Sequence, residues 1–191
     1  NTNKKLTSGG KYHAYIAPKV KKNGQEFGLA IFSKYKITKK GRIQFEDASS
    51  NDAIFADLLI GKDTLRVINV HLESMHINEQ NLTDTDNWKA NAKDLSKRLK
   101  KGFITRAKQL DAIEEYVLNS PHRVILCGDL NDPPYSYTYF KLLRMLRSSF
   151  EHAANGFGFS YNGKLFFLRI DNQFYSKGIT PTNYFTMREV D

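Results

Sequence analysis

The segment RVILCGDLNDPPY, at Arg123–Tyr135, constrains this 191-residue chain more than any other. Its first five residues are a short apolar run, typical of a β-strand that is buried on both faces. Gly128 and a Pro-Pro pair then require a loop. Asp129 and Asn131 stand where the strand meets this loop, and their spacing lets both project from one side. The segment therefore predicts a buried strand with polar groups at its end. The order of elements along the chain, strands with two helical segments interposed, predicts a layered α/β fold.

The rest of the chain reads as strands with two helical segments interposed. A helix is predicted over Trp88–Asn119, with one apolar face, and a second after Ser136, which can cap it. The second helix is expected to bury Phe140, Leu143 and Leu146. The strand-like runs in the first half are Lys11–Ile16, Gly28–Tyr35, Ile54–Ile60 and Leu65–Leu72, and a hairpin turn at Gly61 joins the last two. Two further runs, Phe157–Tyr161 and Lys164–Tyr175, flank the hairpin signal Asn162-Gly163. The first helix would bury Phe103, Ala107, Leu110, Ile113 and Val117.

Composition excludes several classes of protein. Hydrophobic residues make up 40% of the chain and aromatic residues 13%, which is too apolar for a disordered chain. The longest apolar stretches are too short for a membrane span, so no membrane segment is expected. The length suits one domain, residues 1–191.

The charge balance favours a polyanionic or phosphate-bearing partner. Lys and Arg number 29 against 20 Asp and Glu, a net charge of +9. Eight of the basic residues lie between Lys89 and Lys108. Such a run is explained by a solvated helix face or by nucleic-acid binding, and the former is the commoner explanation.

Two further strand segments carry polar side chains that are candidates for catalysis or binding. Asn69 and His71 alternate onto one face at the end of an apolar strand. Asp171 lies within Leu168–Phe174, where burial of a carboxylate would be costly without a partner. The alternatives are a structural histidine for the first segment and, for Asp129 and Asn131, ordinary turn chemistry.

Together these segments resemble the endonuclease/exonuclease/phosphatase superfamily. The resemblance covers roughly Tyr12 to Tyr184, and the GD-x-ND-x-P stretch is its most specific part. Four segments carry it: FGLAIFSKYKI at Phe27–Ile37, RVINVHLES at Arg66–Ser74, VILCGDLNDPPYSYTY at Val124–Tyr139 and RIDNQFYS at Arg169–Ser176. It implies a four-layered α/β sandwich, in which two packed mixed β-sheets are flanked by helices.

The resemblance also implies roles for individual residues. His71 matches the histidine that contacts the scissile phosphate, with Asn69 beside it as a substrate-binding candidate. Asp129 matches the aspartate that orients or deprotonates the attacking water. Asn131 matches the asparagine that donates to a phosphate oxygen. Asp171 matches a buried carboxylate that orients a catalytic histidine or helps to protonate the leaving oxygen. These residue types suit attack on a phosphoryl centre, which needs charge stabilisation and a positioned water.

The sequence departs from the family pattern at both ends. No Leu-Gln-Glu-like stretch with the metal-binding glutamate precedes the first matching segment, and no Ser-Asp-His follows the last. Position 172 is Asn where an aromatic residue is usual. The chain is therefore expected to be a partial domain, without the first strands and the last segment. Asp129 is the remaining candidate ligand for Mg²⁺ or Mn²⁺, and the isolated chain is expected to bind metal weakly and to have little activity alone.

The resulting hypothesis is a metal-dependent phosphoesterase, a nuclease-like enzyme in its full-length form. The alternatives are a hydrolase of a small or lipid phosphoester, of the phosphatase or sphingomyelinase type, and a non-catalytic phosphate-binding remnant. Because a partial sandwich leaves an open sheet edge, pairing with a second copy is also expected.

Overall fold

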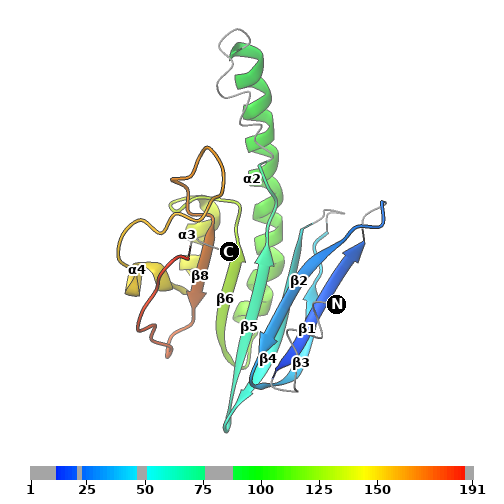
Figure 1. Ribbon diagram of the computed structural model, residues 1–191, viewed down its shortest axis with the longest axis vertical. Helices are drawn as coiled ribbons and strands as arrows, with labels where there is room; N and C mark the ends of the chain where they lie inside the picture. Colours follow the sequence, from blue (N-terminus) through cyan, green and yellow to red (C-terminus); the bar gives the residue numbers. More distant parts are fainter. Residues whose placement is uncertain (1–11, 21–22, 47–50, 76–87, 188–191) are drawn as a thin grey trace.

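The computed structural model describes residues 12–20, 23–46, 51–75 and 88–187, apart from the side chains of residues 88, 89 and 91. Two β-sheets and the helices form an α/β fold, as the sequence predicts (Figure 1). The elements are β1 (His13–Val20), β2 (Glu26–Ser33), β3 (Lys36–Ile43), β4 (Asp52–Ile60), β5 (Asp63–His71), α2 (Trp88–Leu118), β6 (Arg123–Asp129), α3 (Tyr137–Leu143), β7 (Arg147–Ser148), α4 (Ser149–Ala153) and β8 (Asp171–Tyr175).

The larger sheet is mixed and has six strands in the order β3-β4-β5-β6-β8-β7. Strands β5 and β6 run parallel, and α2 is the connection that parallel neighbours require. The pairs β3–β4, β4–β5, β6–β8 and β7–β8 are antiparallel. The strand of the RVILC segment, β6, thus lies in the sheet interior, between β5 and β8.

The two-stranded sheet β1–β2 packs on one face of the larger sheet. Ile54, Ala56 and Leu58 alternate along β4 and are buried against this second sheet. Their partners across the interface are Ala17 of β1 and Ile31 of β2. The residues that alternate with them, such as Phe55, face the opposite side of the sheet.

Helix α2 covers that opposite face. Leu110, Ile113 and Val117 are buried in the main core, as the predicted apolar face requires. Phe103, which was expected on the same face, is 46% exposed. The reason is visible in Figure 1, where the first half of α2 extends past the ends of the strands and has no sheet beneath it.

Helix α3 buries a different face from the predicted one. Ser136 caps it as expected and accepts from the backbone N–H of Tyr139. The buried residues are Thr138, Tyr139 and Leu142, however, and Phe140 is half exposed. Tyr139 determines this rotation because its ring packs edge-on against Phe174 of β8, at 5.2 Å between centroids. Of the expected face, Leu146 is buried and Leu143 lies at the core margin.

The prediction of a hairpin around Asn162-Gly163 is wrong. Residues 157–170 form an irregular loop, and only Asp171–Tyr175 is a strand. Local hydrogen bonds replace a ladder: the backbone N–H groups of Ser160 and Tyr161 both donate to the carbonyl of Leu168. Strand β8 pairs with β6 and β7 instead, so its partners are distant in sequence.

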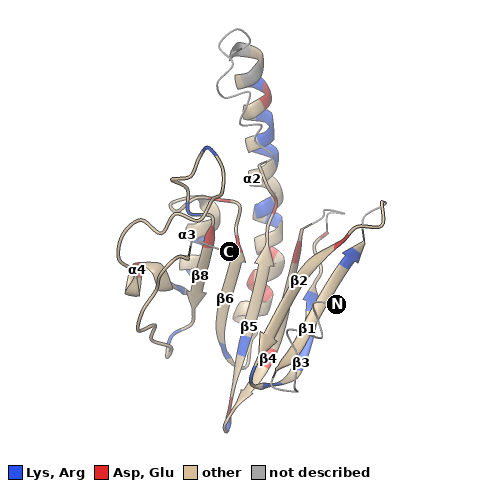
Figure 2. Cartoon of the chain, in the orientation of Figure 1, with Lys and Arg blue, Asp and Glu red and all other residues tan. Residues whose placement is uncertain are grey.

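The basic run lies along α2, as Figure 2 shows, but its residues have two different environments. Arg106 is fully buried, whereas the other members with described side chains, Lys93, Lys97, Arg98, Lys100, Lys101 and Lys108, are exposed. Within the described ranges, no helix has both the length and the apolar composition needed to cross a bilayer.

Candidate active site

Polar residues from neighbouring strands form one row across the end of the larger sheet. His71, the last residue of β5, pairs with Asp129, the last residue of β6. Asp129 pairs in turn with Asp171, the first residue of β8. Paired residues of adjacent strands project to the same face, so the row lies on the side of the β1–β2 sheet. Residues that are 100 positions apart in sequence thus converge, as the sequence predicts.

The central contact of the row joins His71 and Asp129. The Nε2 of His71 lies 3.9 Å from Oδ2 of Asp129, and both side chains are partly open to solvent. Burial raises the pKa of the Asp129 carboxyl, and the neighbouring Asp171 raises it further, while the backbone N–H of Asn131 and the His71 ring oppose the shift. A carboxyl with a raised pKa is a better proton acceptor than an ordinary aspartate.

Asn131 is held tightly beside this pair. Its Nδ2 donates to the carbonyl of Leu72 at 2.8 Å, and its backbone N–H donates to Oδ1 of Asp129 at 2.7 Å. Its φ of 49° lies in the left-handed region, which asparagine tolerates better than most residues. The amide carries a second hydrogen that a phosphate oxygen could accept. The turn therefore orients both Asn131 and Asp129.

The side chain of Asn69 makes a structural hydrogen bond. Its Nδ2 donates to the carbonyl of Ala30 in β2, at 3.1 Å. This bond connects the two sheets at a position two residues before His71 in β5. Because this structural bond explains why an amide is present at position 69, we do not include Asn69 in the proposed site.

The expectation that Asp171 is buried within a strand is wrong. Asp171 begins β8 and is exposed. The preceding loop explains this, because the hydroxyl of Ser160 accepts from the backbone N–H groups of Ile170 and Asp171 and starts the strand at this point. Asp171 influences the pKa of Asp129 and so remains part of the row.

Sequence reasoning missed a fourth residue of the row, Asp52, which supplies a third carboxylate. It pairs with His71 across the β4–β5 hairpin and is 4% exposed. Arg42 Nε lies 3.2 Å from its Oδ2 and Lys19 Nζ 3.9 Å. Burial raises the pKa of Asp52, and these two cations oppose the shift. The signal was available, because counting outward from the Gly61 turn places Asp52 opposite His71.

A buried ion pair beneath the row was also missed. Arg106 of α2 and Asp132 are both fully buried, and their Nη2 and Oδ1 atoms are 3.3 Å apart. Arg106 also donates through Nη1 to the carbonyl of Glu73 at 2.8 Å. The pair thus joins the helix to the chain segments that follow His71 and Asn131. Arg106 lies four residues before Leu110 and seven before Ile113, on the predicted apolar face of the helix, so this helical spacing was the signal that could have marked it as buried.

Gly128 allows the two central strands to approach. Its φ is 139°, and a Cβ atom at this position would lie 2.0 Å from the carbonyl oxygen of Val70. No side chain fits there. The glycine of the GD-x-N segment therefore sets the spacing of β5 and β6 and, with it, the contact between His71 and Asp129.

The donors at the row fit Mg²⁺ in kind, since carboxylate and amide oxygens are its preferred protein ligands. Asp129 and the amide oxygen of Asn131 are the residues that would hold it. Among the described residues, no group of three or more His, Cys, Asp or Glu side chains is placed to hold a metal ion. The set is thus smaller than a dedicated metal centre requires.

Comparisons with known proteins agree with this architecture. The human Nocturnin catalytic domain with bound sulfate anion is similar, with a TM-score of 0.61, 17% identity, and coverage of 93% of this chain and 65% of that one. A D. rerio TDP2 humanized by 14 mutations has a TM-score of 0.56 and 15% identity, and the match covers 94% of this chain and 66% of that one. An endonuclease/exonuclease/phosphatase family protein from Leptotrichia buccalis has a TM-score of 0.59 and 12% identity, with coverage of 91% of this chain and 63% of that one. The chain thus spans about two thirds of the length of these structures.

The search of curated proteins gave no match. The profile of the "Endonuclease/Exonuclease/phosphatase family" matches residues 2–191, which is nearly the whole sequence. The chain therefore belongs to the endonuclease/exonuclease/phosphatase family.

Proposed function

We propose that this chain provides the phosphate-binding part of a phosphoester hydrolase that cleaves phosphodiesters, in the manner of a nuclease. The observation that carries the proposal is the row of His71, Asp129 and Asp171 on three adjacent strands, with Asn131 oriented beside it. A family fold alone would not select this function, since one fold supports many activities.

Each residue has a role that its surroundings support. The His71 ring, when protonated, and the Asn131 amide would bind non-bridging phosphate oxygens and stabilise the charge that develops on them. Asp129 would accept a hydrogen bond from the attacking water and orient it in line with the leaving group. The 3.9 Å between the His71 and Asp129 side chains supports these roles, because it would bring the anion-binding group and the water-orienting group side by side.

Mg²⁺, when bound by Asp129 and Asn131, would supply further charge neutralisation at the phosphate. The second carboxylate of the row, that of Asp171, would raise the affinity of this region for any cation. Protein residues alone would still perform the binding and orientation described above.

A nucleic-acid substrate is the class that the surface charge supports. The chain has a net charge of +9, and exposed basic residues line the protruding half of α2. A long polyanion gains from many such cations, whereas a small phosphoester would contact few of them. The Nocturnin structure, which contains a sulfate anion, is a precedent for anion binding on this fold.

The test combines anion binding with hydrolysis. Phosphorus NMR should detect binding of inorganic phosphate, and the variants His71→Ala and Asn131→Ala should each weaken it about tenfold, since hydrogen bonds to charged groups contribute about 1.5–3 kcal/mol. With Mg²⁺, cleavage of a labelled oligonucleotide should exceed that of p-nitrophenyl phosphate, and Asp129→Asn should abolish it.

Asp63→Asn is the matched control, because Asp63 is exposed and lies at the opposite end of β5, the strand that His71 ends. It should change neither binding nor cleavage. Phosphate binding without cleavage of any ester would identify a non-catalytic phosphate-binding protein. Binding that is insensitive to His71 and Asn131 would refute the site itself.

A further inference from the structure

The loop that follows the candidate site presents one tyrosine to solvent between two fixed points. Asp132 anchors the start of this loop through its buried ion pair with Arg106. Ser136 anchors its end, because it caps α3 and its backbone N–H donates to the carbonyl of Pro133. Tyr135 lies between these anchors and is 79% exposed. The two prolines before it further restrict the backbone.

The backbone of Tyr135 is held in an unfavourable conformation. Its φ is 68°, in the left-handed region, and apart from glycines only Asn131 shares a positive φ among the described residues. For a bulky aromatic residue this conformation is strained, and glycine would adopt it freely. Strain that is retained next to a candidate active site is a reason to look for a function of the side chain.

The Tyr135 ring is supported from behind by other aromatic rings. Its centroid lies 6.2 Å from that of Phe140 and 6.5 Å from that of Tyr139. Tyr139 is fully buried and packs on Phe174, so the support continues into the core. A large exposed ring on a rigid base is what a stacking partner requires, since little side-chain entropy is lost on binding.

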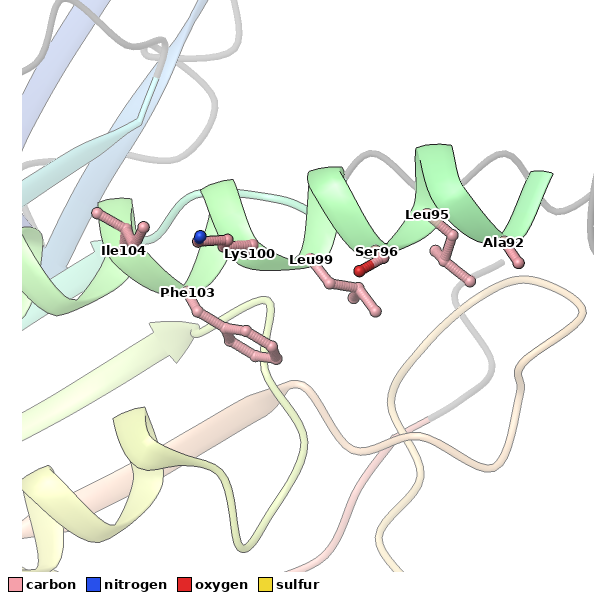
Figure 3. A pocket seen from close by; sticks show the side chains of 7 residues that line it. All are labelled: Ala92, Leu95, Ser96, Leu99, Lys100, Phe103 and Ile104. Carbon is pink, nitrogen blue, oxygen red and sulfur yellow. The ribbon is translucent and has the colours of Figure 1, made fainter. Parts of the chain in front are cut away.

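Tyr135 is also close to the proposed phosphate position and to a cationic surface. It follows Asn131 by four positions, and four residues of extended chain span at most about 14 Å. The Arg106–Asp132 pair joins the same loop to α2, and Lys100 and Lys101 lie about one and a half turns before Arg106. In Figure 3 the side chain of Phe103 extends from this part of the helix toward the loop after β6.

We propose that Tyr135 is a base-stacking residue: its ring binds a nucleobase of a single-stranded nucleic acid whose phosphates lie at His71 and Asn131. The inference rests on the proposed function and adds a specificity-determining residue to it. An aromatic face accepts any planar base, and the exposed cations of α2 would follow the backbone of the same strand. A simple phosphate monoester or an abasic strand has no ring for Tyr135 to bind.

The test separates the base from the phosphates. Fluorescence anisotropy in EDTA should show that a labelled single-stranded oligodeoxynucleotide binds about tenfold more tightly than an abasic strand with the same number of phosphates. Tyr135→Ala should remove this difference and leave the abasic strand unaffected. Tyr135→Trp should restore it. Tyr137→Ala, which removes another exposed tyrosine two residues away, should preserve it.

Tyr135→Gly distinguishes a binding role from a structural one. Because glycine relieves the backbone strain, the melting temperature should be unchanged or higher while the base preference is lost. A lower melting temperature with an intact base preference would assign the ring to packing and overturn the proposal. If Tyr135→Ala weakened binding of the normal strand and of the abasic strand equally, the proposal would be overturned. It would also be overturned if the variant lost only the binding of anionic lipid vesicles, measured in parallel.

The two proposals can fail separately. The base preference is measured without metal or hydrolysis, on the Tyr135 variants. Phosphate binding is measured on the His71 and Asn131 variants. Phosphate binding that depends on His71 together with no base preference would refute only the stacking role. A base preference that depends on Tyr135, with no effect of His71→Ala on phosphate, would refute only the proposed function.

Discussion

Replacement of Arg106 by methionine should be among the most damaging changes to this fold. The guanidinium is fully buried, and its Nη2 lies 3.3 Å from the equally buried Asp132. Its Nη1 donates to the carbonyl of Glu73, and the guanidinium also lies 5.1 Å from the centre of the Phe103 ring. Methionine fills similar space but leaves the buried carboxylate of Asp132 without this cation and removes the hydrogen bond to the carbonyl of Glu73.

The magnitude follows from these contacts. Breaking a buried pair by removing one partner costs about 3–5 kcal/mol, and most of that cost is the uncompensated charge of Asp132. With a urea slope of about 2 kcal/mol/M, a loss of about 4 kcal/mol would lower the unfolding midpoint by about 2 M. The double variant Arg106→Met with Asp132→Leu removes both charges and should recover most of the loss.

Urea unfolding followed by far-ultraviolet circular dichroism measures these effects. The matched control is Arg98→Met on the same helix, where Arg98 and Asp94 form an exposed pair at 2.6 Å. That change should cost less than about 0.5 kcal/mol. If Arg106→Met costs no more than the control, or if the double variant is less stable than Arg106→Met, the reasoning about the buried charge is refuted.

Four further predictions follow from the site and the sheets. Asp129→Asn should stabilise the protein at neutral pH, because the raised pKa of the Asp129 carboxyl means that its ionised form is disfavoured in the folded state. The gain in the free energy of unfolding, measured in urea, should shrink as the pH falls through the folded-state pKa. It should vanish below the pKa that the carboxyl has in the unfolded chain. Gly128→Ala should cost about 3 kcal/mol or more because of the clash with Val70, whereas Gly61→Ala, with a positive φ but open space around it, should cost about 1–2 kcal/mol in the same assay. Calorimetry should find only weak Mg²⁺ binding to the 191-residue chain, and tight stoichiometric binding would contradict the small ligand set. Light scattering should detect dimers formed through the edges of the two-stranded sheet, and a clean monomer at high concentration would count against this.

The sequence predicted best what depends on local periodicity and strong motifs. The run before Gly128 became the interior strand β6, and the periodic segment from Trp88 became the helix α2. His71, Asp129 and Asp171 came together because each lies at a strand end and the resemblance gave the order of the strands. These properties require only the alternation of side chains and a known strand order.

Tertiary contacts decided what the sequence did not predict. Strand β3 is half charged and has little apolar signal, and it forms because β4 offers it an edge. The Asn162-Gly163 dipeptide favours a hairpin, but β8 has better partners in β6 and β7. The burial of Arg106 depends on an aspartate 26 positions away, and no local pattern reveals such a pairing.

The parallel pairing of β5 and β6 has a consequence for the order in which the chain assembles. The β4–β5 hairpin closes through a tight turn, and contacts of this kind form within about 1–10 μs. The β5–β6 pairing requires closure of the whole crossover that contains α2, and such long-range contacts are slow to form. His71 therefore reaches its place in the hairpin before Asp129 arrives beside it. A chain that has folded only in part carries the histidine without the carboxylate, so the complete pair exists only once the crossover has closed.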